Sequence, residues 1–429
     1  MSSSWNAYIK TALDDFSKKK GWYIMVSSIV TKVSNFLLIM FAVRTIPKEV
    51  FGQFSYAQSV MAFLIPMAGA GLNHALVRFG PLEKSLLAKK QLYQKNVKLG
   101  LFISTGLLLI TLLFINTIVA NVPAAKLILL LLLTQMFSVY LLEIVKSALR
   151  VFNRNKSYAV VEMQFALLLL LFGVIGVWQF GILGLCVSYT MAGLVLFLWW
   201  RNKIPSVNGD TRLEKSLPKG YVKYGVYAAL GGVASALMYQ VDILTIGNLI
   251  PSQADLAVYR VATHLPYSLI FLSLAFVHAH YVSLAKNYKS KSALTHFLKQ
   301  YYIIFIPVGL VIYGAVYVTA PWLISAVYGN IYTEAVAPLR VLFLGLLAIF
   351  WLRVPFGNLL GAVGKSSWNA AIATTMIIAN VLLNIYLVSK YGIIGAAWAT
   401  TLLLTLSGSV SLAAFFIYLK KELAHGRMD

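Results

Sequence analysis

The feature that most constrains the fold is a series of long apolar segments that follow one another along all 429 residues. Each is close to the roughly 20 residues that a helix needs to cross a bilayer. Hydrophobic residues make up 60% of the chain and charged residues only 11%, whereas about 25% of residues are charged in ordinary soluble domains. A soluble fold of this size cannot bury so much apolar surface, and the alternating pattern of barrel strands is absent. The sequence therefore predicts an all-α integral membrane protein.

Breaks between the apolar segments predict about twelve transmembrane helices, with boundaries that are approximate by nature. The predicted ranges are 22–44, 50–77, 98–120, 126–149, 157–178, 181–200, 222–249, 256–284, 300–325, 336–360, 367–389 and 393–418. No connection between them is long enough to form a folded domain outside the membrane. We therefore expect the protein to act within the bilayer.

Basic residues are concentrated in alternate connections, and this sets the predicted orientation. The chain has 36 Lys and Arg against 13 Asp and Glu, a net charge of +23. Most of the basic residues lie near the termini or in alternate connections such as 84–98 and 150–156, and Arg78 and Arg150 are assigned to the same side as helix-end charges. Because membrane proteins retain Lys and Arg on the cytoplasmic side, both termini are predicted to be cytoplasmic. The charge then reflects topology and attraction to anionic membrane lipids, so we expect no binding of nucleic acid.

Two phrases with the same pattern of glycines indicate an internal duplication. FGILGLCVSYT (180–190) opens the sixth predicted helix, and YGIIGAAWATT (391–401) opens the twelfth. NKSY (155–158) and KSSW (365–368) repeat at nearly the same separation. Because each half holds an even number of helices, the halves are predicted to be two parallel six-helix repeats around a central cavity. We expect the small residues of the glycine phrases to let neighbouring helices approach closely in lipid.

The duplication predicts five parts of the chain. They are a cytoplasmic amphipathic N-terminal segment at 1–20, an N-lobe of helices 1–6 at 21–200, a cytoplasmic inter-lobe linker at 201–221, a C-lobe of helices 7–12 at 222–418, and a cytoplasmic tail at 419–429. The first segment places its apolar residues on one helical face, which favours a helix lying on the membrane surface; a flexible tail is the alternative. Two similar lobes around a cleft are typical of an alternating-access transporter.

Charged residues at membrane depth mark the candidate site, because a charge at the bilayer centre costs roughly 2.5 to 3.5 kcal/mol on insertion scales. The candidates are the basic residues Lys32, Lys146, Arg260, Arg340 and Arg353 and the acidic residues Glu143, Glu162 and Asp242. In one interpretation the cations face a hydrated cavity and attract an anionic substrate, with Lys32 and Arg353 as the strongest candidates. In the other, Glu143 with Lys146 and Asp242 with Arg260 form ion pairs that fix helix packing. The three acids are also candidates for coupling transport to protons or sodium.

Signatures of enzyme chemistry are missing from the sequence. It contains no phosphate-binding Walker loop, no nucleophile elbow and no dinucleotide fingerprint. His278 and His280 are two residues apart on a predicted helix and so point about 200° away from each other, which excludes a shared metal ion. We therefore expect neither an enzyme nor a cofactor or metal site.

Several stretches resemble the polysaccharide-transporter branch of the multidrug/oligosaccharidyl-lipid/polysaccharide exporter superfamily. AVRTIPKEVFGQFSYAQSV (42–60) and GAGLNHALVRFG (69–80) resemble its first helices, and DILTIGNL (242–249) with VYRVAT (258–263) resembles its seventh and eighth. The longest similar stretch lies between Gly357 and Thr401 and includes ANVLLNIYLVSKYGIIGAAWATT. The size, the twelve spans and the basic character are most similar to those of O-antigen flippases.

This resemblance implies a function. The chain would move an undecaprenyl-pyrophosphate-linked oligosaccharide from the inner to the outer leaflet of the bacterial inner membrane, with other polysaccharide assembly proteins as further candidate partners. The first alternative is a cation-coupled multidrug exporter of the same superfamily, in which acids should dominate the cavity. The second is a membrane polymerase or ligase of polysaccharide assembly, which the absence of a large outward loop disfavours.

Overall fold

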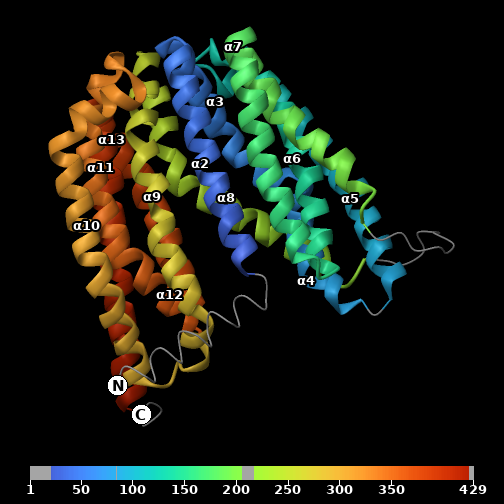
Figure 1. Cartoon of the computed structure of the whole chain (residues 1–429), viewed down its shortest axis with the longest axis vertical. Helices are drawn as coiled ribbons and strands as arrows, with labels where there is room; N and C mark the ends of the chain where they lie inside the picture. The colour runs from blue at the N-terminus through green and yellow to red at the C-terminus, as the bar shows by residue number, and fades with distance from the viewer. Residues whose placement is uncertain (1–20, 84, 205–216, 425–429) are drawn as a thin grey trace. The chain divides into compact units, whose positions relative to one another are not determined.

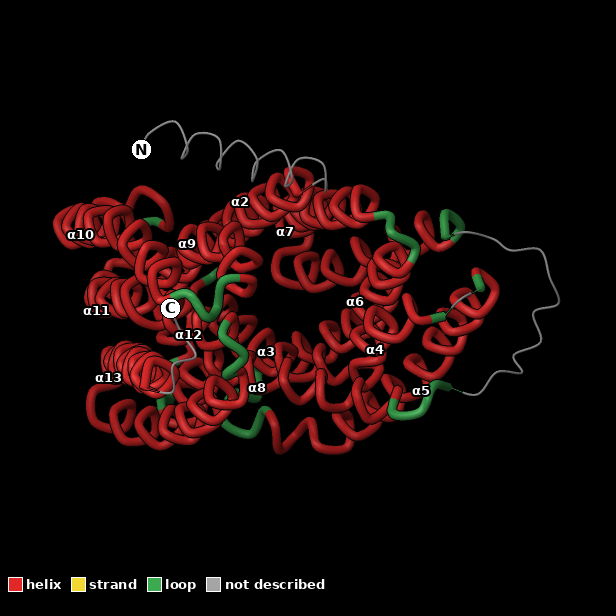
Figure 2. Tube along the Cα trace, turned by 90° about the horizontal axis from the view of Figure 1, so that it is seen from below, coloured by secondary structure: helices red, strands yellow, loops and turns green. Residues whose placement is uncertain are grey.

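The computed structural model describes residues 21–83, 85–204 and 217–424. The predicted amphipathic segment at 1–20 lies outside the described residues, as do most of the predicted linker and the end of the tail. Every regular element in the described part is helical (Figure 1, Figure 2). The prediction of an all-α protein is therefore confirmed.

The helices are labelled as in Figure 1. They are α2 (Gly21–Thr45), α3 (Lys48–Met67), α4 (Leu72–Phe79), α5 (Leu86–Ile118), α6 (Ala125–Val151), α7 (Asn155–Arg201), α8 (Tyr221–Leu249), α9 (Gln253–Lys286), α10 (Lys291–Tyr328), α11 (Val336–Ala348), α12 (Val354–Ala362) and α13 (Ser366–Ala424). Short 3₁₀ or π-helical turns join some of them, namely η1 (Ala68–Gly71), η2 (Gly80–Leu82), η3 (Asn330–Ala335) and η4 (Ile349–Arg353).

Ten segments of the described chain are long and apolar enough to cross a membrane, whereas twelve spans were predicted. The difference arises at α7 and α13, each of which contains two predicted spans in succession. α7 is interrupted at Gly181 (φ 59°, ψ −136°) and α13 at Gly392 (φ 59°, ψ −141°). Both glycines have a positive φ, which residues with a side chain rarely adopt, and both belong to the repeated glycine phrases.

The chain reverses direction at Gly181. Residues 36 positions apart in a straight helix would be about 54 Å apart, yet Trp200 Nε1 donates a hydrogen bond of 2.8 Å to Gln164 Oε1. The two arms of α7 therefore run antiparallel, and the backbones of Gly176 and Gly184 touch where the arms meet. In α13, Gly395 lies against the Leu387 carbonyl at the same spacing from its own interruption. Counting α7 and α13 as two crossings each turns the ten segments into twelve.

The described chain forms two compact units, one of residues up to Pro47 with Ala57–Ala236 and the other of Lys48–Tyr56 with Leu237 onward. Within the first unit α6 packs against α4, α5 and α7, and 67% of its span is buried. Within the second unit α11 and α12 pack against α9 and α13, and 61% of their span is buried. α5 and α10 are the least buried, at 17% each. Corresponding spans of the two predicted repeats thus have similar burial, while the predicted lobe boundaries stay a prediction.

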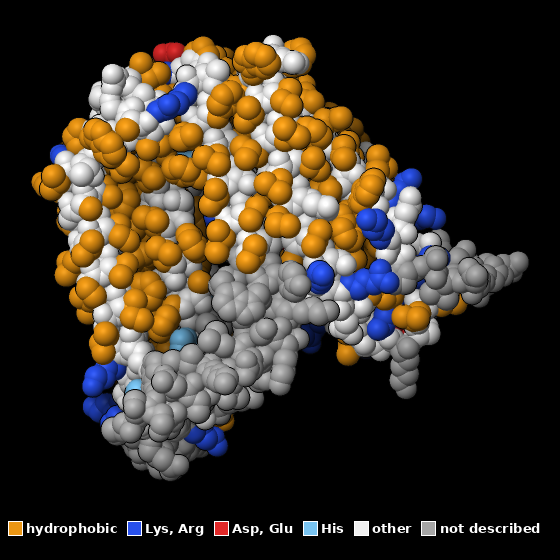
Figure 3. Space-filling view, viewed as in Figure 1, with side chains coloured by type: hydrophobic (Ala, Val, Ile, Leu, Met, Phe, Trp, Pro, Cys, Tyr) orange, Lys and Arg blue, Asp and Glu red, His pale blue; other side chains and the backbone are white. Residues whose placement is uncertain are grey.

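Large apolar side chains cover the outer faces of the helices. Figure 3 shows hydrophobic side chains over most of the visible described surface, with Lys and Arg gathered near helix ends. Phe102, Leu113 and Trp178 are each 77% exposed. A surface of this kind is stable only against lipid, so the protein is a multi-pass integral membrane protein.

The close contact within α7 predicts a stability effect. A Cβ atom at Gly184 would overlap the carbonyl of Gly176, whereas a Cβ at Gly106 in α5 would meet no atom within 4 Å. We expect Gly184→Ala to lower the free energy of unfolding by about 1 to 3 kcal/mol and Gly106→Ala to leave it unchanged or raise it slightly. Thermal unfolding of the two purified variants in detergent checks this, and equal stabilities would contradict the hairpin packing.

Candidate functional site

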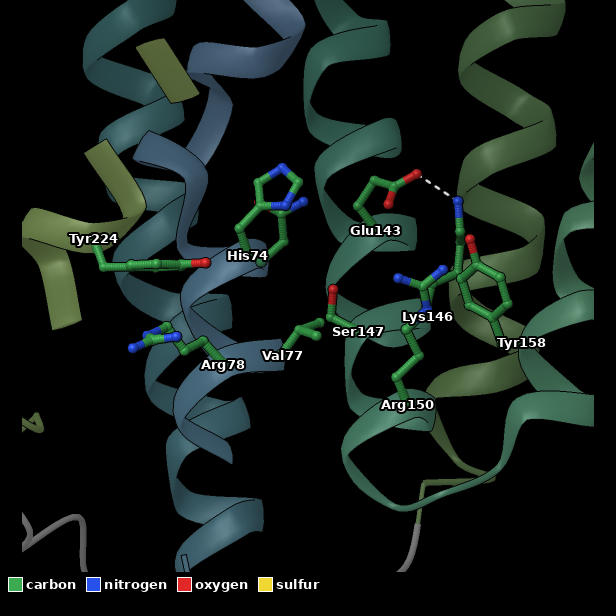
Figure 4. A pocket seen from close by; sticks show the side chains of 10 residues that line it. His74, Val77, Arg78, Glu143, Lys146, Ser147, Arg150, Tyr158 and Tyr224 are labelled. Atoms are coloured by element: carbon green, nitrogen blue, oxygen red, sulfur yellow. Dashed lines mark hydrogen bonds and ion pairs between the residues drawn. The ribbon is translucent and has the colours of Figure 1, made fainter. Parts of the chain in front are cut away.

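A pocket of about 370 Å³ lies in the first unit, where α4, α6, α7 and α8 come together (Figure 4). Its lining is mainly polar and charged, in contrast to the apolar surface of the helices. The lining residues are Asn73, His74, Val77, Arg78, Glu143, Lys146, Ser147, Arg150, Tyr158 and Tyr224. Three of them are Lys or Arg and one is acidic, so the lining carries an excess of positive charge.

Helical periodicity explains why α6 supplies four of these residues. Glu143, Lys146, Ser147 and Arg150 are spaced at i, i+3, i+4 and i+7, which places them on one face of a helix. The other faces of this part of α6 carry buried apolar residues such as Ile144 and Leu149. The pocket therefore lies against the polar face that α6 presents near its C-terminal end.

Lys146 is held between two carboxylates at the edge of the pocket. Its side chain is 7% exposed, and Nζ lies 2.5 Å from Glu143 Oε1 and 2.6 Å from Glu162 Oε1. Tyr158 donates a hydrogen bond of 3.0 Å to Glu162 Oε1. A buried ammonium requires this kind of compensation, because removing one partner from a buried pair leaves an uncompensated charge. The structure thus contains the ion pair between Glu143 and Lys146 that one interpretation predicted, and Glu162 is an additional partner of Lys146.

Two arginines give the pocket its available positive charge. Arg78 and Arg150 form no ion pair with any carboxylate of the described chain. The Arg150 guanidinium carbon lies 3.9 Å from the centre of the Tyr158 ring, and that of Arg78 lies 5.2 Å from the centre of the Tyr224 ring. Stacking on a ring occupies the face of a guanidinium and leaves its N–H groups free to donate at the edge. Such a pair of cations suits an anion with several oxygen acceptors.

The structure places Asp242 in a separate buried cluster of the second unit. The residue is 1% exposed, and its carboxylate accepts hydrogen bonds from Thr400 (2.5 Å), Tyr259 (2.6 Å) and Asn384 (2.9 Å). All three donors are neutral. Arg260, the partner of Asp242 in the ion-pair interpretation, donates to the Ser55 carbonyl at 3.1 Å and to Gln240 Oε1 at 3.3 Å. The carboxylate is therefore surrounded by neutral donors and does not form the ion pair with Arg260 that one interpretation predicted.

Arg353 ends a π-helical turn of the second unit. The turn widens the helix, and its Phe350 and Trp351 carbonyls accept hydrogen bonds of 2.7 and 2.6 Å from Tyr301 and Tyr302 of α10. Arg353 Nη1 lies 3.0 Å from Asn369 Oδ1. π-Helical turns occur frequently at functional sites, so the location of Arg353 is compatible with its predicted role in binding substrate.

The remaining predicted cations lie apart from the pocket. Arg340 donates to the Tyr317 carbonyl at 3.0 Å and stacks on the Tyr317 ring. Lys32 is exposed on α2 and is not among the residues that line the pocket. Of the eight predicted site residues, the structure brings Glu143, Lys146 and Glu162 together in one cluster.

Arg78 and Arg150 were not predicted as site residues, because charges at helix ends are the ordinary markers of topology. The stripe formed by Glu143, Lys146, Ser147 and Arg150 was the available signal for Arg150. For Arg78 the available signal was its spacing of four residues from His74, which places both side chains on one face of a helix, but the packing of that face against α6 depends on tertiary structure. Within the described residues, no group of three or more His, Cys, Asp or Glu is arranged to hold a metal ion.

Comparison of folds shows similar structures over almost the whole chain. The lipid II flippase MurJ, in an inward closed conformation, has a TM-score of 0.72 at 17% sequence identity, covering 91% of this chain and 87% of that chain. An inward-facing multidrug resistance MATE family transporter of the MOP superfamily has a TM-score of 0.73 at 14% identity, covering 91% and 95%. A MOP superfamily transporter from Pyrococcus furiosus, described as having a binding pocket of reverse polarity, has a TM-score of 0.61 at 14% identity, covering 95% of each chain.

Comparison of sequences identifies the family. Curated protein sequences gave no significant match. The family described as "Polysaccharide biosynthesis protein" matches residues 17–277, more than half of the chain. The chain therefore belongs to the polysaccharide biosynthesis protein family, and its fold is that of the MurJ and MATE transporters of the MOP superfamily.

Proposed function

We propose that this protein is a flippase that moves an undecaprenyl-pyrophosphate-linked oligosaccharide, an O-antigen or related polysaccharide repeat unit, from the inner to the outer leaflet of the bacterial inner membrane. The observation that carries the proposal is the pocket in which Arg78 and Arg150 stack on tyrosine rings. The family, and the similarity in fold to a lipid II flippase, support it. Alternating access between the two membrane faces is the proposed mechanism.

The chemistry of a pyrophosphate fits the two arginines. Each phosphate offers several oxygen acceptors, and a guanidinium edge donates two parallel hydrogen bonds to such a group. The pocket volume of about 370 Å³ also falls within the usual range for small-molecule sites.

In the proposed orientation the pocket opens toward the cytoplasm, where the precursor is made. Lys146 contributes little free charge, because Glu143 and Glu162 both contact it. Its proposed part is to fix α6 and α7 so that Arg150 and Tyr158 stay stacked. The other deep cations, Lys32, Arg260, Arg340 and Arg353, are proposed to line the later path of the headgroup.

A coupling ion is proposed to act at Asp242. The carboxylate is buried, and its hydrogen-bonding partners are all uncharged. They are hydroxyl and amide groups, which can reorient. A small cavity lined by Asn380 and Thr400 lies beside it. Binding of a proton or a sodium ion would neutralise this charge, which is costly to keep in an apolar interior.

The pocket also bears on the alternative of a multidrug exporter. Exported drugs of that class are mostly cations, so a matching site should carry an excess of carboxylates. Of the three Lys and Arg residues in the lining, Lys146 is paired with Glu143 and Glu162, whereas Arg78 and Arg150 form no ion pair with a carboxylate of the described chain. This favours an anionic substrate. A polymerase or ligase receives no support from any group found in the pocket.

The pocket arginines provide the first test. Because a hydrogen bond to a charged group is worth about 1.5 to 3 kcal/mol, we expect Arg78→Ala or Arg150→Ala to weaken binding of undecaprenyl pyrophosphate by roughly tenfold or more. Surface polysaccharide should fall in parallel. The matched control is Lys98→Ala, which removes an exposed cation of α5 outside the pocket. Equal binding by all three variants would contradict the assignment.

The deep cations outside the pocket are tested separately. We expect Lys32→Ala or Arg353→Ala to stop surface polysaccharide assembly while the protein still inserts and accumulates in the membrane, because the headgroup would lose an attractive contact during its passage. Polysaccharide on cells and protein in membrane fractions are measured side by side. Normal polysaccharide in both variants would remove the two residues from the proposed path.

Asp242→Asn tests coupling. The amide keeps the shape of the side chain and can still bond to the surrounding hydroxyls, so we expect a folded protein. Transport in vesicles should lose its response to an imposed proton or sodium gradient, whichever drives the wild type. A variant that responds to the gradient as the wild type does would rule out Asp242 as the coupling site.

A further inference from the structure

The second membrane span is interrupted by an unusual turn. Between α3 and α4, the φ angles of Gly69, Ala70 and Gly71 are 62°, 48° and 65°. Three successive residues are therefore in the left-handed region, and Ala70 has a side chain that disfavours it. A non-glycine residue in this conformation persists only where the surrounding structure enforces it.

Packing around the turn enforces the conformation. The Gly69 N–H donates a hydrogen bond of 3.0 Å to Ser104 Oγ of α5, so a backbone group released by the break is satisfied inside the protein. The Tyr140 ring covers Gly69, and the Gly225 carbonyl lies against Gly71, so neither position has room for a side chain. Tyr140 is itself fixed by a hydrogen bond of 2.8 Å from its hydroxyl to the Asn96 carbonyl.

The short helix that follows the turn forms one wall of the pocket. α4 starts at Leu72, immediately after the left-handed residues. Its Leu72, Ala75 and Leu76 are buried, while its His74 and Arg78 line the pocket with Asn73 and Val77. The direction and rotation of α4 thus decide whether Arg78 faces the pocket, and the turn sets both.

We propose that the left-handed turn at Gly69–Gly71 is the positioning element of the anion pocket, which holds Arg78 of α4 opposite Arg150 of α6. This inference rests on the proposed function for the identity of the ligand, whereas the placement of α4 by the turn does not depend on that function. Figure 4 shows Arg78 and His74 on one helix, with the Arg78 guanidinium beside Tyr224, and Arg150 with Lys146 on another, with the Arg150 guanidinium beside Tyr158. All of these residues line the same pocket. A continuous α3–α4 helix would have no left-handed turn to redirect it, so α4 would take a different direction.

Substitutions at Ala70 separate positioning from folding, because this position is half-buried and has a side chain already. Asn and Gly adopt the left-handed conformation readily, whereas the β-branched Val does not. We expect Ala70→Gly and Ala70→Asn to bind inorganic pyrophosphate within about twofold of the wild type, and Ala70→Val to bind about tenfold more weakly. Gly106→Val is the matched control for a bulky residue on an open helix face and should bind normally.

A distance measurement tests the geometry without a ligand. Spin labels at Val77→Cys on α4 and Ser147→Cys on α6, in a background with the buried Cys186→Ser, report the separation of the two helices. Ala70→Val should shift or broaden this distance, and Ala70→Asn should preserve it. An unchanged distance and unchanged pyrophosphate binding in a folded Ala70→Val protein would overturn the inference.

A second variant covers the case in which Ala70→Val does not fold. Ser104→Ala removes the acceptor of the Gly69 N–H and introduces no bulk. It should broaden the label distance and weaken pyrophosphate binding several-fold, and wild-type behaviour would overturn the inference. If the wild type binds no pyrophosphate while the label distances respond as expected, the proposed function fails and the positioning element stands.

Discussion

The structure depends on one constraint of the bilayer interior, where polar and charged groups find no water and must be satisfied by the protein itself. Each irregular feature of the chain follows this constraint. Lys146 is paired with two glutamates, Asp242 is surrounded by hydroxyl and amide donors, and the π-helical carbonyls before Arg353 accept from two tyrosines. Arg78 and Arg150 differ from this pattern, because both are exposed near helix ends and the groups beside them are aromatic faces and not carboxylates. That difference marks the pocket as a place where an anion can complete the balance.

The two glycine phrases show how the same constraint shapes the fold. Apolar side chains gain nothing by leaving lipid for one another, so helices in a membrane associate through close packing and hydrogen bonds. Gly184 against Gly176, and Gly395 against the Leu387 carbonyl, allow the arms of α7 and α13 to touch. Gly181 and Gly392 supply the backbone conformation at which the chain reverses. A repeated phrase is therefore a repeated hairpin, placed at the last helix pair of each half.

Much of the fold could be predicted because membrane insertion imposes a pattern on local sequence. Span length, the distribution of basic residues and the glycine phrases are features of one or two neighbouring helices. The structure agrees with the predictions made from span length and from the glycine phrases. The break of the second span could not be predicted, since glycine is frequent in ordinary membrane helices and the turn depends on Tyr140 and Ser104, which are distant in sequence. The site could be predicted only in part, because contacts between residues distant in sequence bring some of its members together. Glu143 and Lys146 share a helical face, whereas Glu162 and Arg78 reach the site through tertiary packing.

We propose that a lipid-linked oligosaccharide crosses the membrane through this protein, and the leaflet in which this precursor accumulates provides a direct test. Cells that lack the gene would be probed with a reagent or enzyme that reaches only the outer leaflet. We expect the complete lipid-linked oligosaccharide to accumulate in the inner leaflet of these cells, and the wild-type gene to restore its appearance in the outer leaflet. Normal delivery to the outer leaflet in the absence of the gene, in a cell with no second transporter of this family, would contradict it.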